Sequence, residues 1–397
     1  MSVALAGTDQ DWWEHGERRV PADLTVARLR PHLAALGITR LARQTGLDRV
    51  GIPCFSAIRP AALTLSVSQG KGVDDFSAMA SALMEAAEFA IAERPGVATR
   101  LATTDDLARA GAACADVRHL MAEDLPPDRP IHWFEGESWP SGTPIFLPAD
   151  ALTIGTTPED LPSISRSTNG LASGNTREEA LFHAISELLE RDATSLWSLL
   201  DNPRRRATEF APEAITEPEV RAMCDAIGAA GLELRLFDQT TDLGVPCVMA
   251  VVRERPMGGA RMFDMAAGYG CHPVGSRAIA RAITEAAQTR ITNIAGGRDD
   301  FLPDEYFEGV DESTLFLAEP RAGDAGAPSW LETGTPLPEL LSHLADRVGS
   351  VANLAWAELG GAPYGISVIR ALSDVLEDRE TNINWVPGPR ALRVLGR

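Results

Sequence analysis

Carboxylates recur in three separate stretches of the sequence that have helical periodicity. Glu85 and Glu88 lie in the first stretch, Glu187 and Glu190 in the second, and Glu285 in the third. All three stretches are otherwise rich in alanine, leucine and isoleucine, which is typical of largely buried helices. A buried carboxylate must be paired, hydrogen-bonded or bound to a metal ion. The pattern therefore indicates a site for a hard cation such as Mg²⁺, bridging to phosphates.

Each of these stretches carries its polar residues on one narrow face. We expect helices over 76–93, 177–197 and 276–294, in which successive side chains are about 100° apart around the axis. The apolar residues face elsewhere, so the polar faces are narrower than a solvated surface would be. The residues that join the five carboxylates on these faces are Ser81, Arg191, Arg281, Thr284, Gln288 and Thr292.

An ordinary alternative exists for each helix taken alone. Glu187 with Arg191, and Arg281 with Glu285, have the i,i+4 spacing of surface ion pairs, which stabilise exposed helices by roughly 0.2–0.5 kcal/mol each. The recurrence of carboxylates on three helices favours a shared site, but the spacing by itself leaves the surface interpretation open.

Glycine-containing loops precede the first two helices. In "QGKGVDD", Lys71 stands between two glycines, which allow a backbone to approach an anion while the lysine supplies a point charge. In the second loop, Thr176 and Glu179 predict a capping box at a helix N-terminus, where anions are favoured. No GxxxxGK[ST] motif occurs, so neither loop is a Walker A loop.

The composition is that of a globular protein, with 397 residues of which 45% are hydrophobic and 23% charged. The formal net charge, 36 − 56 = −20, argues against non-specific binding to nucleic acid or to an anionic membrane. The sequence shows neither a signal-peptide pattern nor an apolar stretch of membrane-spanning length. We therefore expect a cytoplasmic protein.

The cysteine and histidine residues near the polar helices have structural interpretations. Five widely spaced cysteines without a CxxC motif favour neither a disulfide framework nor a structural zinc site. Cys271, just before the third helix, is a candidate sulfur carrier, but a single cysteine is more often a small core residue. His183, on the second helix, is a candidate base, although a structural role is more common. We expect both residues to be structural.

Helices and strands are intermixed in runs without strict βαβ alternation. This arrangement favours an α+β fold, in which layered mixed or antiparallel sheets pack against long helices. We expect one catalytic region with a helical segment over about 1–50, a core over about 51–320, and a C-terminal lobe and tail over about 330–397. A linker is expected at 321–329. The strands are expected within 51–69, 131–157, 232–238, 245–254, 263–271, 353–358 and 365–371.

Three segments of the sequence resemble the signature segments of the YcaO family. They read "GKG…SALMEAAE", "SRSTNGLASGNTREEALFHAISELLERD" and "RAIARAITEAAQTRITNIAGGRDD". They occur in the family's order and the similarity spreads over roughly residues 45–300. The third segment is most similar to YcaO proteins that work with a TfuA partner.

The resemblance implies a YcaO fold and an ATP- and Mg²⁺-dependent enzyme that acts on peptide backbone amides. Members of the family phosphorylate the amide oxygen, after which a nucleophile attacks the activated carbon. A Cys, Ser or Thr side chain as nucleophile gives an azoline, whereas a sulfur donor gives a thioamide. Activation makes physical sense because an amide carbonyl is a poor electrophile and its oxygen is a poor leaving group.

The resemblance also implies roles for the candidate residues. Lys71 and Ser81 would contact the nucleotide, and Asn169 would line the loop before the second helix. Arg191, Arg281, Glu285 and Gln288 would contact the nucleotide or its phosphates. The expected metal ligands are Glu85, Glu88, Glu187 and Glu190, and the expected catalytic residues are Glu187, Glu190, Arg191 and Arg281.

The C-terminal sequence discriminates between the two products. Azoline-forming YcaO proteins typically end in a proline-rich PxPxP tail that helps to form the site. Here the sequence ends "NINWVPGPRALRVLGR", in which Pro387 and Pro389 give a single PxP followed by eight residues. This departure favours thioamide formation on a ribosomal peptide or protein.

The expected partners are a TfuA-like protein, a sulfur donor and a peptide or protein substrate, with neither nucleic acid nor membrane. Whether the chain forms a homodimer stays open. Two alternatives remain, an azoline-forming cyclodehydratase and a non-catalytic scaffold that binds nucleotide or peptide. A degenerate scaffold would be expected to lose part of the carboxylate set, which is complete in this sequence.

Overall fold

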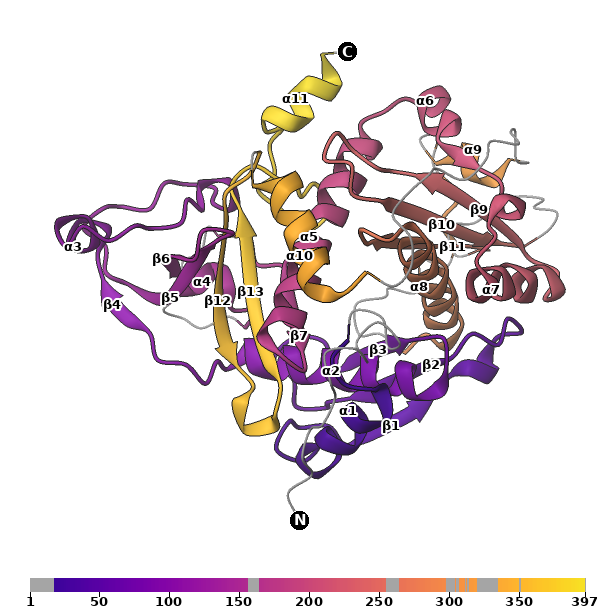
Figure 1. Cartoon of the computed structure of the whole chain (residues 1–397), viewed down its shortest axis with the longest axis horizontal. Coiled ribbons are helices and arrows are strands. Elements are labelled where there is room, and N and C mark those ends of the chain that lie inside the picture. Colours follow the sequence, from indigo (N-terminus) through magenta and orange to yellow (C-terminus); the bar gives the residue numbers. More distant parts are fainter. Residues whose placement is uncertain are drawn as a thin grey trace.

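A computed structural model of the chain describes residues 18–155, 164–254, 264–297, 304, 307–310, 312, 314–319, 335–349 and 351–396. Three antiparallel sheets surround a central group of long helices. Figure 1 shows the largest sheet on the left, the β8–β11 sheet on the upper right and the β1–β3 sheet on the lower right, with α2, α5 and α8 between them. The expected linker at 321–329 lies outside the described residues.

The first sheet has the order β1-β2-β3, from β1 (Arg40–Arg43), β2 (Cys54–Ile58) and β3 (Val67–Lys71). It packs against α2 (Asp75–Glu93), which also contacts α1 (Ala22–Leu29). The helical segment expected over 1–50 is therefore only partly correct, since residues 40–43 form a strand. Gly37 has a φ of 72° and ends the helical stretch, and the following residues pair with β2.

The second sheet has the order β11-β10-β9-β8 and supports the third polar helix. Helix α8 packs on β10 and β11, and α7 packs on β9 and α8. Apolar side chains from these two helices and from the buried strands form one continuous core cluster. The elements are β8 (Glu209–Phe210), β9 (Glu233–Asp238), β10 (Cys247–Arg253), β11 (Met265–Cys271), α7 (Pro218–Ala229) and α8 (Gly275–Ala295).

The third sheet has the order β4-β5-β12-β13-β7, with β6 paired to β5. The two C-terminal strands thus lie between strands from the first half of the chain. The strands within the C-terminal lobe expected over about 330–397 complete this sheet through backbone hydrogen bonds to β5 and β7. The strands are β4 (Arg100–Ala102), β5 (Ile131–Trp139), β6 (Thr143–Pro148), β7 (Leu171–Gly174), β12 (Leu354–Gly360) and β13 (Ser367–Ser373).

The second polar helix, α5 (Arg177–Ser198), packs on β7 and β13 of the third sheet. Its N-cap residue is Thr176, whose hydroxyl accepts a hydrogen bond from the Glu179 amide at 3.3 Å, as the sequence predicted. The reciprocal half of the predicted capping box differs, because the Glu179 carboxylate accepts from the Asn175 amide at 2.8 Å. The remaining helices are α3 (Thr104–Arg109), α4 (Ala149–Leu152), α6 (Asn202–Ala207), α9 (Leu315–Ala318), α10 (Leu337–Val348) and α11 (Pro389–Leu395).

Glycines in the strands bring two polar helices into direct contact with their sheets. A Cβ at Gly70 in β3 would lie 2.1 Å from the backbone nitrogen of Ala82 in α2. A Cβ at Gly268 in β11 would lie 2.1 Å from the nitrogen of Ala286 in α8. Backbone packs on backbone at these points, and this close approach fixes where the polar face of each helix lies.

We predict that Gly268→Ala lowers the free energy of unfolding by about 1–3 kcal/mol, because the added methyl group collides with the backbone of α8. Gly228→Ala is the matched control in α7, since no atom lies within 4 Å of its Cβ position. This control is expected to raise stability by about 0.5–1 kcal/mol. Urea unfolding of both variants measures the difference, and equal stability of the two would contradict the close-packing argument.

Candidate functional site

A cavity of ≈ 1030 Å³ lies where α2, α5 and α8 meet. Ten of the eleven candidate residues line it: Lys71, Ser81, Glu85, Glu88, Glu187, Glu190, Arg191, Arg281, Glu285 and Gln288. Asn169 does not. It lines a smaller neighbouring cavity, while the adjacent Thr168 lines the large one. The three polar helix faces are thus walls of one space, although they are far apart in the sequence.

The carboxylates raise one another's proton affinity because they are buried together. Burial raises the pKa of Glu187 to about 7, with Glu190 adding to the effect and Arg191 opposing it. Burial and Glu285 likewise raise the pKa of Glu190 to about 7. The pKa of Glu88 is raised well above its usual value by burial, and then by Glu187 and Glu85. Such a cluster attracts cations strongly.

Basic side chains at the same cavity come from different elements. The Lys71 ammonium in β3 forms an ion pair with the Glu285 carboxylate in α8, which joins the first and second sheets across the cavity. Lys71 is the only lysine in the sequence. Arg281 approaches the His183 imidazole, with 2.8 Å between its guanidinium nitrogen and His183 Nδ1.

The ion pair of Arg191 is formed with a residue from the C-terminal part of the chain. Its guanidinium contacts the Glu380 carboxylate at 3.2 Å. Burial alone would lower the pKa of Arg191, but the nearby Glu187 and Glu190 carboxylates raise it overall. The surface ion-pair interpretation of Glu187 and Arg191 is therefore wrong, because both side chains line a cavity and the partner of Arg191 is distant in sequence.

Several residues at the site could not be identified from the sequence. Arg370 in β13 is 3% exposed and lies in the electrostatic field of Glu187, Asp378 and Glu88. Burial lowers its pKa to about 10, against the effect of these carboxylates. It lies far from the three polar helices in sequence, and no motif marks it. Gln69 and Tyr269, which line the large cavity, also lie outside the candidate set.

The two residues expected to be structural have different environments. Cys271 is fully buried and faces Cys247 across the β10–β11 ladder, which agrees with a core role. His183 lines the large cavity and contacts Arg281, so it orients a candidate site residue as well as packing against Phe182. The amphipathic pattern of α5 gave no signal for this contact, because Arg281 comes from another helix.

The residues at the cavity fit a metal-bound nucleotide better than a metal ion alone. In the described part of the chain, no group of three or more His, Cys, Asp or Glu side chains could hold a metal ion. Mg²⁺ commonly uses one or two carboxylates and takes further ligands from phosphate and water. The buried Arg191 Nε has no hydrogen-bond partner, so the wall retains an unsatisfied donor for an anion.

Among the described residues, no helix combines the length and apolar character that crossing a membrane requires.

The chain belongs to the YcaO family, since the sequence profile of the ATP- and Mg²⁺-binding YcaO cyclodehydratases matches residues 69–357. This is a family of ATP-dependent peptide-modifying enzymes that bind ATP and Mg²⁺. The resemblance drawn from the three sequence segments is thereby confirmed.

Two similar sequences bear on which branch of the family this chain resembles. One is an uncharacterized protein encoded in the tfuA 3′ region of Rhizobium leguminosarum bv. trifolii, 39% identical over 377 residues, which covers 92% of this chain and 89% of that protein. The other, from Methanothermobacter thermautotrophicus, is also uncharacterized and is 38% identical over 282 residues, covering 69% and 70% of the two chains. The first supports the TfuA-associated branch.

Solved structures share the fold. A YcaO protein from Methanopyrus kandleri bound with AMPPCP and Mg²⁺ has a TM-score of 0.70 and 23% identity, covering 94% of this chain and 97% of that one. A heterocyclase in complex with substrate and cofactor has a TM-score of 0.73 and 20% identity. The similarity covers 91% of this chain but only 53% of that heterocyclase, so this chain spans about half of its length. The predicted α+β YcaO fold is confirmed.

We predict that the nucleotide-free protein loses stability as pH rises from about 5 to 8. The folded state holds protons on Glu187 and Glu190 up to about pH 7, whereas the unfolded state releases them near the ordinary value of 4.5. Their favourable contribution is complete below that value and is lost as pH rises through about 7, a change on the order of a few kcal/mol.

Urea unfolding in metal-free buffer across this pH range measures the effect. Glu187→Gln should flatten the profile, while Glu178→Gln, at an exposed position of the same helix, should leave it unchanged. A Glu187→Gln profile as steep as that of the unmodified protein would contradict the buried-carboxylate assignment.

We also predict that Mg²⁺·AMPPCP protects Lys71 from an amine-acylating reagent by about tenfold or more at saturating nucleotide. Lys71 is the only side-chain amine in the sequence, so peptide mass spectrometry identifies the modified site without ambiguity. The N-terminal amine is the internal control, and Mg²⁺ without nucleotide is the second control. Equal acylation of Lys71 with and without nucleotide would remove it from the nucleotide site.

Proposed function

We propose that this protein uses ATP to activate a peptide backbone amide, which a sulfur nucleophile then converts to a thioamide. The observation that carries the proposal is the cavity that Lys71, Arg191 and Arg281 line together with five glutamates. Phosphoryl transfer depends mainly on positioning and charge neutralisation. The basic side chains of this cavity can neutralise phosphate charge, and its carboxylates can hold the metal ion that positions the phosphates.

The chemistry can be written as a balanced exchange. ATP supplies the γ-phosphoryl group to the amide oxygen with release of ADP, and hydrosulfide then adds to the activated carbon and displaces inorganic phosphate. The amide oxygen leaves with the phosphate, a C=S bond replaces the C=O bond, and the hydrosulfide proton passes to the released phosphate. No change of oxidation state occurs, so the reaction needs no oxidant or reductant.

Residues from all three helices have roles in this proposal. Lys71, Arg191 and Arg281 bind phosphate oxygens, and His183 holds the guanidinium of Arg281 in place. Ser81, Asn169, Glu285 and Gln288 complete the nucleotide site in the proposal, with Asn169 acting from the adjoining loop. The Mg²⁺ ligands come from Glu85, Glu88, Glu187 and Glu190, which ionise fully when the cation binds.

The path of the C-terminal residues supports a thioamide over an azoline. In azoline-forming relatives, the proline-rich tail helps to form the site. Here Pro389 begins α11, whose helix contacts α5, and no described residue after Gln288 lines the large cavity. The C-terminal residues instead line the smaller cavity with Asn169 and Arg370, and they reach the large cavity only through the ion pair of Glu380 with Arg191.

A separate protein supplies the sulfur in this proposal. The similar Rhizobium protein is encoded beside tfuA, which supports a TfuA-like partner for this chain. The substrate is a peptide or protein with an accessible backbone amide. The proposal leaves the protein free to act as a monomer or a homodimer, because every assigned residue comes from one chain.

Azoline formation is the second candidate, and the similarity in fold to a heterocyclase with bound substrate favours it. Both candidates share the phosphorylation step and differ only in the nucleophile. A non-catalytic scaffold is disfavoured because all four expected metal ligands line the same cavity.

Mass spectrometry of a peptide substrate distinguishes the two products. With ATP, Mg²⁺, sulfide and the TfuA-like partner, we predict a gain of about 16 Da for exchange of oxygen by sulfur. A loss of about 18 Da would instead show dehydration to an azoline, and would contradict thioamidation while keeping the activation step.

Two variants control for the site assignment. Glu190→Gln should abolish both ATP turnover and the mass shift with the fold retained, because a metal-facing carboxylate is lost from the cavity wall. Glu178→Gln, exposed on the same helix, should keep both activities. Full turnover in Glu190→Gln would contradict the assigned role of this carboxylate.

A further inference from the structure

The C-terminal segment 377–391 reaches two residues of the proposed site by direct contact. Glu380 forms the ion pair with Arg191, and Asp378 accepts a hydrogen bond from the Asn169 side-chain amide at 3.0 Å. Asn169 is 9% exposed and Asp378 8% exposed, so their contact is shielded from water. Two carboxylates of one segment thus hold one side chain from α5 and one from the turn before β7.

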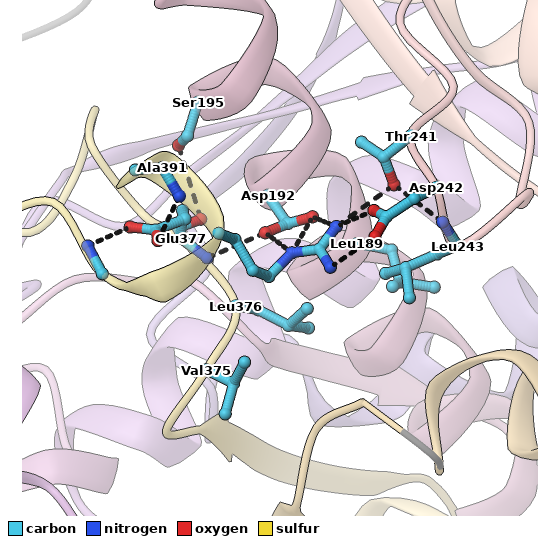
Figure 2. Close-up of polar contacts among 12 residues, drawn as sticks. Leu189, Asp192, Ser195, Thr241, Asp242, Leu243, Val375, Leu376, Glu377 and Ala391 are labelled. Atoms are coloured by element: carbon cyan, nitrogen blue, oxygen red, sulfur yellow. Dashed lines mark hydrogen bonds and ion pairs between the residues drawn. The ribbon is translucent and has the colours of Figure 1, made fainter. Parts of the chain in front are cut away.

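The segment is fixed to α5 through a buried arginine of α11. The Arg390 guanidinium donates to both oxygens of Asp192, with Nε at 2.9 and 3.1 Å, and it donates to the Asp242 carboxylate at 2.6 Å. Arg390 is 3% exposed and Asp192 is fully buried. Figure 2 shows the two acceptor residues, Asp192 and Asp242, near each other. Asp192 immediately follows Arg191, so the anchor lies next to the proposed site.

A second buried carboxylate organises the turn within the segment. Glu377 accepts hydrogen bonds from the Trp385 indole, from the Gly388 amide and from the Ala391 amide, at 2.9, 3.2 and 2.9 Å. The Glu377 amide itself donates to Asp192 at 3.0 Å (Figure 2). Asp192 therefore holds both ends of the segment, at residue 377 through the backbone and at residue 390 through the side chain.

The segment also lines the smaller cavity, of ≈ 70 Å³. Asn169, Leu188 and Arg370 line this space together with Trp385 and Pro389 of the segment. The Arg370 guanidinium donates to the Ser167 carbonyl at 2.5 Å, while its Nε has no hydrogen-bond partner. Displacement of the segment would expose this guanidinium and the loop that carries Asn169.

We propose that Arg390 is a positioning residue for the nucleotide site, which acts by anchoring segment 377–391 so that Glu380 and Asp378 orient Arg191 and Asn169. The inference rests on the proposed function only for the assignment of Arg191 and Asn169 to the nucleotide site. It is independent of whether the product is a thioamide or an azoline.

The anchor is best tested by removing both of its charges together. Deleting Arg390 alone would leave Asp192 buried and unpaired, which destabilises a fold, whereas replacing both partners is far better tolerated. The double variant Asp192→Asn/Arg390→Met serves this purpose. Arg393→Met is the matched control, because Arg393 is exposed on the same helix. Calorimetric titration with Mg²⁺·AMPPCP measures nucleotide affinity, and amide hydrogen exchange reports the order of 377–391.

We expect the double variant to remain folded, to lose exchange protection over 377–391, and to bind Mg²⁺·AMPPCP about tenfold or more weakly. The Arg393→Met control should match the unmodified protein. Retained affinity with a released segment would overturn the positioning role, and a segment that stays protected would overturn Arg390 as its anchor. If the unmodified protein bound no nucleotide, the proposed function would fail instead.

Single substitutions separate positioning from structural support. Arg390→Lys keeps a charge opposite Asp192 and should recover part of the lost affinity. Glu380→Gln leaves the anchor intact, and we expect it to weaken Mg²⁺·AMPPCP binding by roughly two- to fivefold, since its ion pair with Arg191 is partly exposed. Tighter binding in Glu380→Gln would mean that Glu380 competes with phosphate for Arg191, and would overturn the positioning role.

Discussion

The burial of like charges around one cavity is the constraint on which this structure depends. Five glutamates from α2, α5 and α8 line this cavity, and burial, together with repulsion between neighbouring carboxylates, raises the pKa values of Glu88, Glu187 and Glu190. The folded chain can keep these carboxylates ionised only with cations nearby. Lys71, Arg191 and Arg281 provide part of that charge, and a metal-bound nucleotide would provide the rest.

Each of the three sheets contributes one wall of the cavity. Helix α2 packs on the first sheet, α8 on the second and α5 on the third. Glycines at Gly70 and Gly268 allow two of these helices to lie directly on strands. The rigid part of the site thus comes from backbone packing, while the ion pair of Lys71 with Glu285 links two sheets across the cavity. The site forms where the helices of the three sheets meet, and no single sheet contains it.

Periodicity was sufficient to locate the three polar helices and their candidate residues. The pattern over 276–294, for example, closely predicts α8, because alanine and isoleucine recur at helical spacing beside a narrow polar face. It failed at residues 40–43, where Gly37 ends the helical stretch and pairing with β2 determines the conformation. It also failed for Arg370, since a single arginine in a short strand carries no periodic or motif signal.

By itself, the sequence determined the helices, the side chains on their polar faces and the family, because these follow from local spacing and from the order of three motifs. Only the tertiary structure decided which charges meet. Glu187 and Arg191 have the spacing of an ion pair, yet Arg191 binds Glu380, almost two hundred residues away in sequence. Likewise, Arg390 meets Asp192 only because β12 and β13 enter the third sheet and return the chain to α5. Contacts between distant segments depend on this topology, which local periodicity does not encode.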